Sequence, residues 1–455
     1  MALIVAGDRS GVGKTTITLA LLASLRQRFP HQVVQSFKVG PDYIDPMFHR
    51  AITGRPCRNL DPLLTSERYV RQCFTAHSQG ADYALVEGVM GLFDGAAATE
   101  TASTAHVAKL LGVPVLLVVD AQRTSRSVAA LVHGFRSFDP AVTVAGVVLN
   151  RVGSDRHRDL LLAAMAAIQM PVLGVLRRDA EIAIPSRHLG LVPSDELVMP
   201  PLMARLAHIG QSAFDWERLL PRLIPEVSPT PADERATLTP PASAPPLRLA
   251  VATDAAFNFY YADNLDLLAQ GAEIHHWSPL QDPWPKGVDG LYLGGGFPEM
   301  FAAALAANQP GRQGLQRAVQ SGLPIYAECG GLMYLCRTLR DIGGAAHAMV
   351  GAIPAQVTMG DRLTLGYRRA EALASTPLVN AGESVWGHEF HHSQMAITSP
   401  APIYDLQRFD GGPLPPEGWH SSTIHASYLH LHWGATPHLP QRFLHRCARH
   451  AVTFH

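Results

Sequence analysis

The chain has 455 residues and a formal net charge of −1 at pH 7, with 37 lysines and arginines against 38 acidic residues. This balance gives no electrostatic reason to expect nucleic acid or a membrane surface as a partner. A chain of this length is expected to form two or three domains. No apolar run approaches the length of a membrane span, and the amino-terminal residues lack a signal pattern. Because the five cysteines also lack the spacing of a disulfide framework, we expect a cytoplasmic location.

The first predicted elements are a buried strand at residues 3–6 and a following helix, joined by the glycine-rich turn GDRSGVGKTT. Small residues before a helix let backbone amides and the helix N-terminus hold a phosphate. The residues predicted to bind nucleotide phosphates are Gly11, Gly13, Lys14, Thr15 and Thr16. Lys14 would reach the terminal phosphates and Thr15 would bind Mg²⁺. The common motif has its upstream glycine at position 8, but this chain has Asp8 there, and its glycine, Gly7, lies one residue earlier.

The rest of the first half alternates short apolar strands with helices. Further strands are predicted at 33–37, 83–86, 115–119, 144–149 and 172–175. This alternation predicts an α/β domain at 1–224, with a parallel sheet covered on both faces. Seven prolines and no glycine in 225–246 predict a stiff, extended linker, and a second α/β domain follows at 247–455.

Two acidic loops follow strands of the first domain, at the sheet edge where open parallel sheets bind ligands. Glu87 directly ends a predicted strand, so its carboxylate can join Thr15 on Mg²⁺, and Asp45 is a plausible third ligand. A solvated loop residue or a helix cap is the alternative for each carboxylate. The side chains expected to face substrate are Lys38, Asp42, Tyr43 and Asp94. Asn150, which ends the strand AGVVLN, stands where an amide can contact the nucleotide base.

The stretch LPIYAECGGLMYLC predicts a buried strand, a turn and a helix in the second domain, with Cys329 on the turn. A sharp strand-to-helix turn exposes a nucleophile, and the helix N-terminus favours a thiolate. Cys336, placed within that helix, is interpreted as a small buried hydrophobic residue. Amides of Gly330 and, from LYLGGGFPE, of Gly295 and Gly296 are candidate donors to a developing oxyanion.

A thiolate nucleophile needs a histidine base, and two histidine clusters follow in the sequence. GHEFHHS contains His388, and ASYLHLHW contains His430 and His432, which a strand would place on one face. A zinc site is disfavoured, because no cysteine or carboxylate is spaced with these histidines as a zinc set requires.

Six motifs in order resemble those of the cobyrinic acid a,c-diamide synthase family of cobalamin biosynthesis. They are KVGPDYIDPMFH, VEGVMGLFDG, LYLGGGFPE, YAECGGLMYL, GHEFHHS and ASYLHLHW. The first half is similar to the ATP-dependent enzymes related to dethiobiotin synthetase, including the departure in phosphate-loop spacing. The second is similar to a flavodoxin-like class I glutamine amidotransferase domain of the cobyrinic type. The resemblance covers nearly the whole chain except the linker.

The resemblance implies that Cys329 attacks the carboxamide of glutamine and releases ammonia, with His430 as the activating base and His432 as the close alternative. It implies that ATP and Mg²⁺ bind at the matching residues of the first domain, Lys14, Thr15 and Glu87. An acyl phosphate would form on the a and c acetate side chains of the corrin, and ammonia would displace the phosphate.

Many class I amidotransferases carry an acidic residue shortly after the activating histidine. Here Leu431, His432 and Trp433 follow instead, so the third member of the triad is absent or comes from elsewhere.

The implied partners are glutamine, ATP and a corrinoid of the tetracarboxylate type. Arg362 and Arg368 are candidates to bind the carboxylates of this corrinoid, and surface salt bridges are the alternative for both arginines.

Hydrogenobyrinic acid or a nickel sirohydrochlorin is an alternative substrate, and the motifs barely distinguish it from cobyrinic acid. Cobyric acid synthase is disfavoured by the forms of GHEFHHS and ASYLHLHW. A partitioning-type ATPase would leave Cys329 without a role, and a non-enzymatic corrinoid-binding protein would need neither Cys329 nor Lys14. The oligomeric state stays open, with a homodimer as one alternative.

Overall fold

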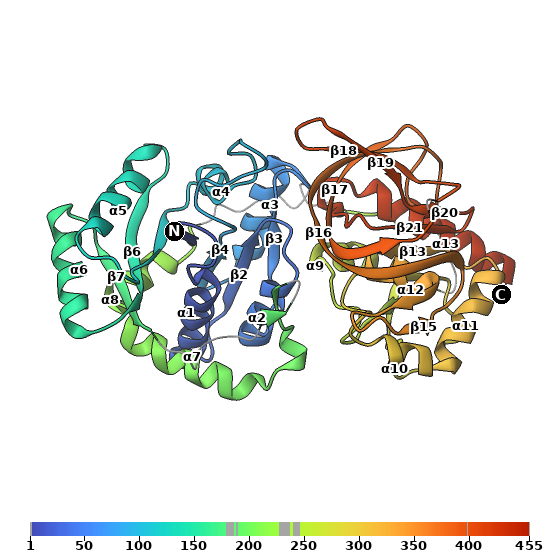
Figure 1. The fold of residues 1–455 in the computed structure, drawn as a ribbon, viewed down its shortest axis with the longest axis horizontal. Coiled ribbons are helices and arrows are strands. Elements are labelled where there is room, and N and C mark those ends of the chain that lie inside the picture. Colours follow the sequence, from blue (N-terminus) through green and yellow to red (C-terminus); the bar gives the residue numbers. More distant parts are fainter. Residues whose placement is uncertain are drawn as a thin grey trace. The chain divides into compact units, whose positions relative to one another are not determined.

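The computed structural model describes residues 2–178, 186–187, 190–226, 237–239, 246–397 and 399–454. The chain divides into two compact units, Met1–Arg235 and Ala236–His455, and each is described by itself (Figure 1). This division falls within the proline-rich stretch at 225–246. Most of the linker predicted there lies outside the described residues.

A seven-stranded parallel sheet in the order β3-β2-β4-β1-β5-β6-β7 forms the centre of the first unit. The strands are β1 (Leu3–Gly7), β2 (Val34–Val39), β3 (Arg58–Leu60), β4 (Tyr83–Glu87), β5 (Val115–Asp120), β6 (Val144–Val152) and β7 (Val172–Arg177). The helices are α1 (Lys14–Arg28), α2 (Ile44–Thr53), α3 (Glu67–Ser78), α4 (Thr104–Leu111), α5 (Ser127–Phe138), α6 (Asp155–Ala167), α7 (Met199–Ala213) and α8 (Trp216–Leu223). A 3₁₀ turn, η2 (Ser194–Glu196), and a small hairpin of β8 (Ser186–Arg187) and β9 (Gly190–Leu191) complete the described part of this unit.

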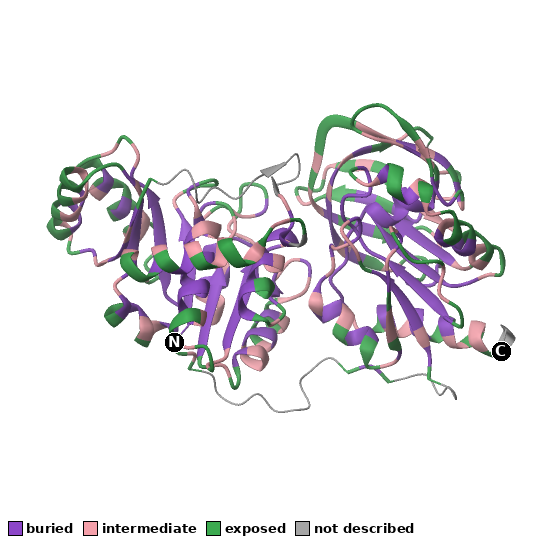
Figure 2. Ribbon diagram, turned by 90° about the horizontal axis from the view of Figure 1, so that it is seen from below, coloured by how far each residue is buried: buried purple, intermediate pink, exposed green. Residues whose placement is uncertain are grey.

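The parallel sheet predicted for the first half is confirmed, and all six predicted strands are present. Their central residues are buried, because helices cover both faces, and the exposed residues lie on the outer faces of the helices and in loops (Figure 2). The sequence did not predict β3, since three residues that include Arg58 and Asn59 carry too weak an apolar pattern.

The second unit contains a six-stranded sheet in the order β11-β10-β12-β13-β21-β20, parallel except for its last pair. The strands are β10 (Arg248–Ala252), β11 (Glu273–Trp277), β12 (Gly290–Leu293), β13 (Ile325–Glu328), β20 (Trp419–His420) and β21 (Ile424–Ser427). The helical segments are α9 (Ala262–Ala269), α10 (Ala302–Ala307), α11 (Gln309–Gln320), α12 (Gly330–Leu335), η4 (Trp433–Ala435) and α13 (His438–Phe454). Among the described residues, no helix has the length and apolar character needed to cross a bilayer.

A second, largely antiparallel sheet of this unit was not predicted. It consists of β14 (Cys336–Arg340), β15 (Ala346–Ala348), β16 (Ile353–Ala372), β17 (Ser384–Met395), β18 (Tyr404–Arg408) and β19 (Pro413–Glu417). The placement of Cys336 in a helix is wrong: α12 ends at Leu335 and Cys336 begins β14, although its burial is as expected. The long β16–β17 hairpin carries the motif GHEFHHS.

Candidate active sites

The predicted phosphate-binding loop of the first unit lies between β1 and α1 and is held by a side chain at the end of β6. Gly11 and Gly13 both have left-handed backbone, with φ of 77° and 98°, which glycine adopts without strain. The side-chain amide of Asn150 donates to the carbonyl of Val12 at 2.8 Å, and a Cβ on Gly13 would lie only 2.5 Å from that amide nitrogen. Asn150, predicted to contact the base, therefore also holds the loop.

Arg151 is a loop-positioning residue that the sequence did not reveal. Its guanidinium donates to the carbonyl of Gly11 at 2.8 Å and pairs with Asp120 at 2.7 Å. Arg9, within the loop, pairs with the same carboxylate at 3.0 Å. The end of β5 thus joins two cationic side chains beside the phosphate-binding loop.

Lys14 begins α1 and donates to the carbonyl of Met90, in the loop after β4. Met90 has a left-handed φ of 46°, an unfavourable conformation for a non-glycine residue that often marks a functional site. Burial and the nearby charge of Lys38 lower the pKa of Lys14 to about 8. An anionic ligand at the loop would favour the charged form.

The three predicted metal ligands lie together at the start of α1. The Thr15 hydroxyl is 2.7 Å from a carboxylate oxygen of Glu87 and 3.3 Å from one of Asp45. Glu87 is fully buried at the end of β4, and Asp45 lies in the first turn of α2. A hydroxyl and two carboxylates form a hard-oxygen donor set that fits Mg²⁺.

Lys38 and His49 surround this acidic pair. The Lys38 ammonium is 2.9 Å from Asp45 and 3.3 Å from Glu87, and these carboxylates raise its pKa although burial acts in the opposite direction. His49 Nε2 lies 2.8 Å from the second Glu87 oxygen. Burial would raise the pKa of Glu87, but Lys38 and His49 hold it well below its usual range.

His49 was missed as a site residue, although one signal for it exists. It follows Asp45 by four positions on α2, so both side chains lie on the same helix face. Its second nitrogen, Nδ1, is 3.4 Å from the Cys57 sulfur. The cluster around Glu87 is therefore larger than the three predicted ligands.

The residues predicted to face substrate have different surroundings. Asp42 accepts the backbone amides of Ile44 and Asp45 at 2.9 and 3.1 Å, which is the helix-cap alternative. Asp94 is exposed and accepts the Gly91 amide, while Tyr43 is buried.

In the second unit, Cys329 occupies a strained turn between β13 and α12, with φ of 47°. Its amide donates to the carbonyl of Ser427 on the neighbouring strand at 2.7 Å, and its sulfur lies 4.0 Å from the carbonyl of Phe390 on β17. The predicted placement of Cys329 on a turn between a strand and a helix is confirmed. The expected preference for a thiolate was wrong for the free thiol, because burial, with the charges of Glu299 and Glu328, raises its pKa.

The three glycines predicted to supply oxyanion donors lie close to one another and to His430. A Cβ on Gly330 would lie 3.2 Å from the amide nitrogen of Gly296. A side chain at Gly295 would collide with the ring of His430. The absence of side chains at these positions thus lets the Gly296 amide lie close to Gly330, next to Cys329, and lets the His430 ring lie against Gly295.

His430 and His432 have different partners. Both lie beyond β21, which ends at Ser427, so the expectation of a shared strand face is wrong. His430 forms an antiparallel bridge with His388 through both backbone groups, at 2.9 and 3.0 Å. His432 accepts the Gly434 amide through Nδ1 at 3.2 Å and so caps η4.

Arg368 and Arg362, the candidates for binding substrate carboxylates, differ in exposure. Arg368 forms a buried ion pair with Glu389, so the surface salt bridge considered for it is wrong, and Arg362 is exposed. Glu389 precedes Phe390, whose carbonyl faces Cys329. The pair therefore joins β16 to β17, the strand whose Phe390 carbonyl lies near the Cys329 sulfur.

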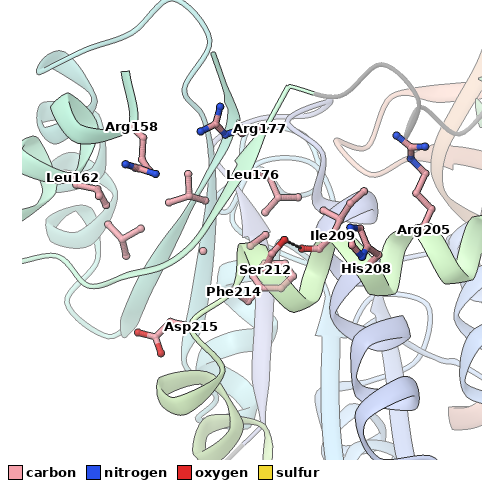
Figure 3. A pocket seen from close by; sticks show the side chains of 14 residues that line it. Arg158, Leu162, Leu176, Arg177, Arg205, His208, Ile209, Ser212, Phe214 and Asp215 are labelled. Atoms are coloured by element: carbon pink, nitrogen blue, oxygen red, sulfur yellow. Dashed lines mark hydrogen bonds between the residues drawn. The ribbon is translucent and has the colours of Figure 1, made fainter. Parts of the chain in front are cut away.

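An open cavity of about 830 Å³ follows the outer edge of the first sheet, at β7 (Figure 3). Its lining includes Arg158 and Leu162 of α6, Arg177 of β7, and Arg205 and His208 of α7. None of the residues predicted for the nucleotide or metal site lines it.

A glycine-rich loop before a helix in one α/β unit and a cysteine on a strand-to-helix turn in the other fit a nucleotide-binding domain joined to an amidotransferase domain. Residues 3–192 match the family model of the CobQ/CobB/MinD/ParA nucleotide binding domain, and residues 248–438 match that of the CobB/CobQ-like glutamine amidotransferase domain.

Curated relatives identify the family more closely. The chain is 56% identical to a cobyrinate a,c-diamide synthase of Synechococcus sp., over 98% of both chains. It is 50% identical to one of Synechocystis sp., over 98% of this chain and 93% of the relative. A hydrogenobyrinate a,c-diamide synthase of Streptomyces coelicolor is 44% identical, over 98% of this chain and 97% of the relative. The chain belongs to the cobyrinate a,c-diamide synthase family, and the resemblance seen in its six motifs is confirmed.

Proposed function

We propose that the chain uses ATP and glutamine to amidate the a and c acetate side chains of cobyrinic acid. The observation that carries this proposal is the pairing of the two sites, one built to bind a phosphate and one to present a cysteine. It is supported by the full-length similarity to relatives named for this activity.

In the first unit, the substrate carboxylate attacks the terminal phosphate of ATP, which gives an acyl phosphate and ADP. Lys14 and the loop amides hold the phosphates, while Asn150 keeps the loop in place. Thr15, Asp45 and Glu87 would hold Mg²⁺, which supplies positive charge to offset the charge on the transferred phosphate. Lys38, within the same cluster, would then orient the carboxylate.

In the second unit, the sulfur of Cys329 attacks the carboxamide carbon of glutamine. His430 takes the thiol proton and delivers it to the departing ammonia. The amides of Gly295, Gly296 and Gly330 would stabilise the oxyanion. Water then hydrolyses the thioester to glutamate, and ammonia displaces phosphate from the acyl phosphate to form the amide.

The similarity to a hydrogenobyrinate enzyme keeps that metal-free corrinoid as a second candidate substrate. Mass spectrometry of products from a panel of cobyrinic acid, hydrogenobyrinic acid and nickel sirohydrochlorin distinguishes the three. Cytoplasmic location and a homodimer stay proposals, the first supported by five buried cysteines that form no disulfide.

The division of labour is tested by Cys329→Ala. This variant should lose amidation driven by glutamine and keep amidation driven by an ammonium salt, because the cysteine only supplies ammonia. Cys336→Ala, at another buried cysteine, is the matched control and should keep both activities. Lys14→Ala should lose both, since neither nitrogen source reacts with an unactivated carboxylate. Failure of ammonium to restore the Cys329 variant would contradict the proposal.

A further inference from the structure

Glu328 is a buried carboxylate directly before Cys329, and the mechanism proposed above does not use it. It ends β13 and is only 1% exposed. Its side chain lies on the same face of the strand as Tyr326, because side chains two positions apart share a face. The hydroxyl of Tyr326 and, at 3.1 Å, that of Tyr292 donate to this carboxylate. These hydrogen bonds offset the cost of burying the group.

Glu328 also contacts the segment that carries His430, in two ways. One carboxylate oxygen accepts the backbone amide of Leu431 at 3.0 Å. The other lies 3.6 Å from Nδ1 of His430. The contact follows from the sheet order, since β13 and β21 are neighbours with Glu328 paired to Ser427, and His430 lies three residues beyond that pair.

We propose that Glu328 is the positioning residue for His430 and supplies the acidic group of the triad that is missing after the histidine. Its carboxylate faces Nδ1, which leaves Nε2, on the side of Gly295, to accept the thiol proton. The negative charge stabilises the imidazolium that forms when the proton moves. The inference rests on the proposed role of Cys329 and His430 in releasing ammonia from glutamine.

Glu328 could instead act on the Cys329 thiol directly, through its charge. That effect on thiol ionisation is opposite in sign to the effect expected from positioning His430, so an experiment can separate the two roles. The charged groups that face Cys329 are Glu299, Glu328 and Glu389, and each raises the pKa of the thiol. The titratable groups that face His430 are Glu328, which lies 3.6 Å from its ring, and His388. Neutralising Glu328 would ease thiol ionisation if it acted on Cys329 alone. It would hinder ionisation if it acts by stabilising protonated His430.

The test is Glu328→Gln in the full chain, because glutamine keeps an acceptor for the Leu431 amide and removes only the charge. We expect kcat of glutamine hydrolysis to fall by about 10²–10⁴-fold, the usual contribution of positioned acid–base catalysis. The KM for glutamine and ammonium-driven synthesis should stay near the parent values. Labelling of Cys329 by iodoacetamide should slow. Asp263→Asn, which neutralises the carboxylate 3.8 Å from His432, is the matched control and should keep parental glutaminase activity.

Faster labelling of Cys329, or an unchanged kcat, in Glu328→Gln would overturn the proposal. If Glu328→Gln does not fold, Tyr292→Phe tests the role of Glu328 instead. This variant keeps the charge of Glu328 and removes one hydrogen bond to its carboxylate. A loss of about 10-fold in kcat supports the proposal, as for other residues that orient a functional group, and no loss overturns it. A parent chain that hydrolyses glutamine but does not amidate corrinoids would contradict the proposed function while leaving the role of Glu328 intact.

Discussion

The stability of the second unit should depend on pH through His425, a fully buried histidine in β21. Its Nδ1 lies 2.9 Å from the Thr376 hydroxyl and its Nε2 lies 3.5 Å from that of Tyr404. Burial, with the charge of His420, lowers the pKa of His425 from 6.5 to about 3. The imidazole of the folded chain therefore stays neutral over a range in which the unfolded chain takes up a proton.

The sign of the effect follows from this difference in proton binding. Between pH 6.5 and 3 the unfolded state binds more protons than the folded state, so acid favours unfolding. The contribution of His425 is intact above pH 6.5 and is lost progressively as the pH falls through this interval. Between pH 7 and pH 5 the loss of unfolding free energy is about 2 kcal/mol, at about 1.4 kcal/mol per pKa unit.

Urea unfolding of the full chain at pH 7 and pH 5 measures this loss. Tryptophan fluorescence reports mainly on the second unit, because five of the six tryptophans lie there. His425→Asn keeps an amide near Thr376 but cannot titrate, so its loss between the two pH values should be smaller than the parent's by about 2 kcal/mol. Tyr404→Phe removes a neighbouring hydroxyl and should keep the parental loss. An equal loss in His425→Asn and the parent would refute the reasoning.

Two further predictions concern the active sites. His49→Leu removes the hydrogen bond that orients Glu87, so calorimetry with ATP present should show Mg²⁺ binding weakened by about 10–100-fold, and unchanged binding would separate His49 from the metal site. His430→Ala should lower glutaminase activity by about 10²–10⁴-fold, whereas His432→Ala should cost much less because that ring caps η4. If labelling of Cys329 by a glutamine-like electrophile stops only in His432→Ala, the roles of the two histidines are reversed.

The elements that carry the motifs could be predicted because strong local patterns mark them. β1 and β4 are continuous apolar runs ending at Gly7 and Glu87, and such runs predict buried parallel strands without knowledge of their neighbours. The nucleophile turn could be predicted because glycines directly follow Cys329 at the end of an apolar strand. In both units the sequence identifies which residues stand at the carboxyl ends of strands.

What the sequence could not predict depends on contacts between distant segments. Glu328 precedes His430 by about one hundred residues, and only the adjacency of β13 and β21 brings their side chains together. The long β16–β17 hairpin was missed because exposed and buried residues mix along β16, which weakens the alternation expected of a strand. The partner of Arg368 was unpredictable for the same reason, since Glu389 lies on the facing strand of that hairpin.

The proposed role of His430 as the base requires its ring to be held in place, because the environment of Cys329 differs from the expected one. Helix α12 has only six residues, and its N-terminal dipole does not offset burial among Glu299, Glu328 and Glu389, so the pKa of the free thiol is raised. In the proposed mechanism the thiolate therefore forms by proton transfer to a base already in place. Because the backbone of His430 is bonded on both sides to His388, and Glu328 faces its ring, the ion pair of thiolate and imidazolium can form without rearranging the base.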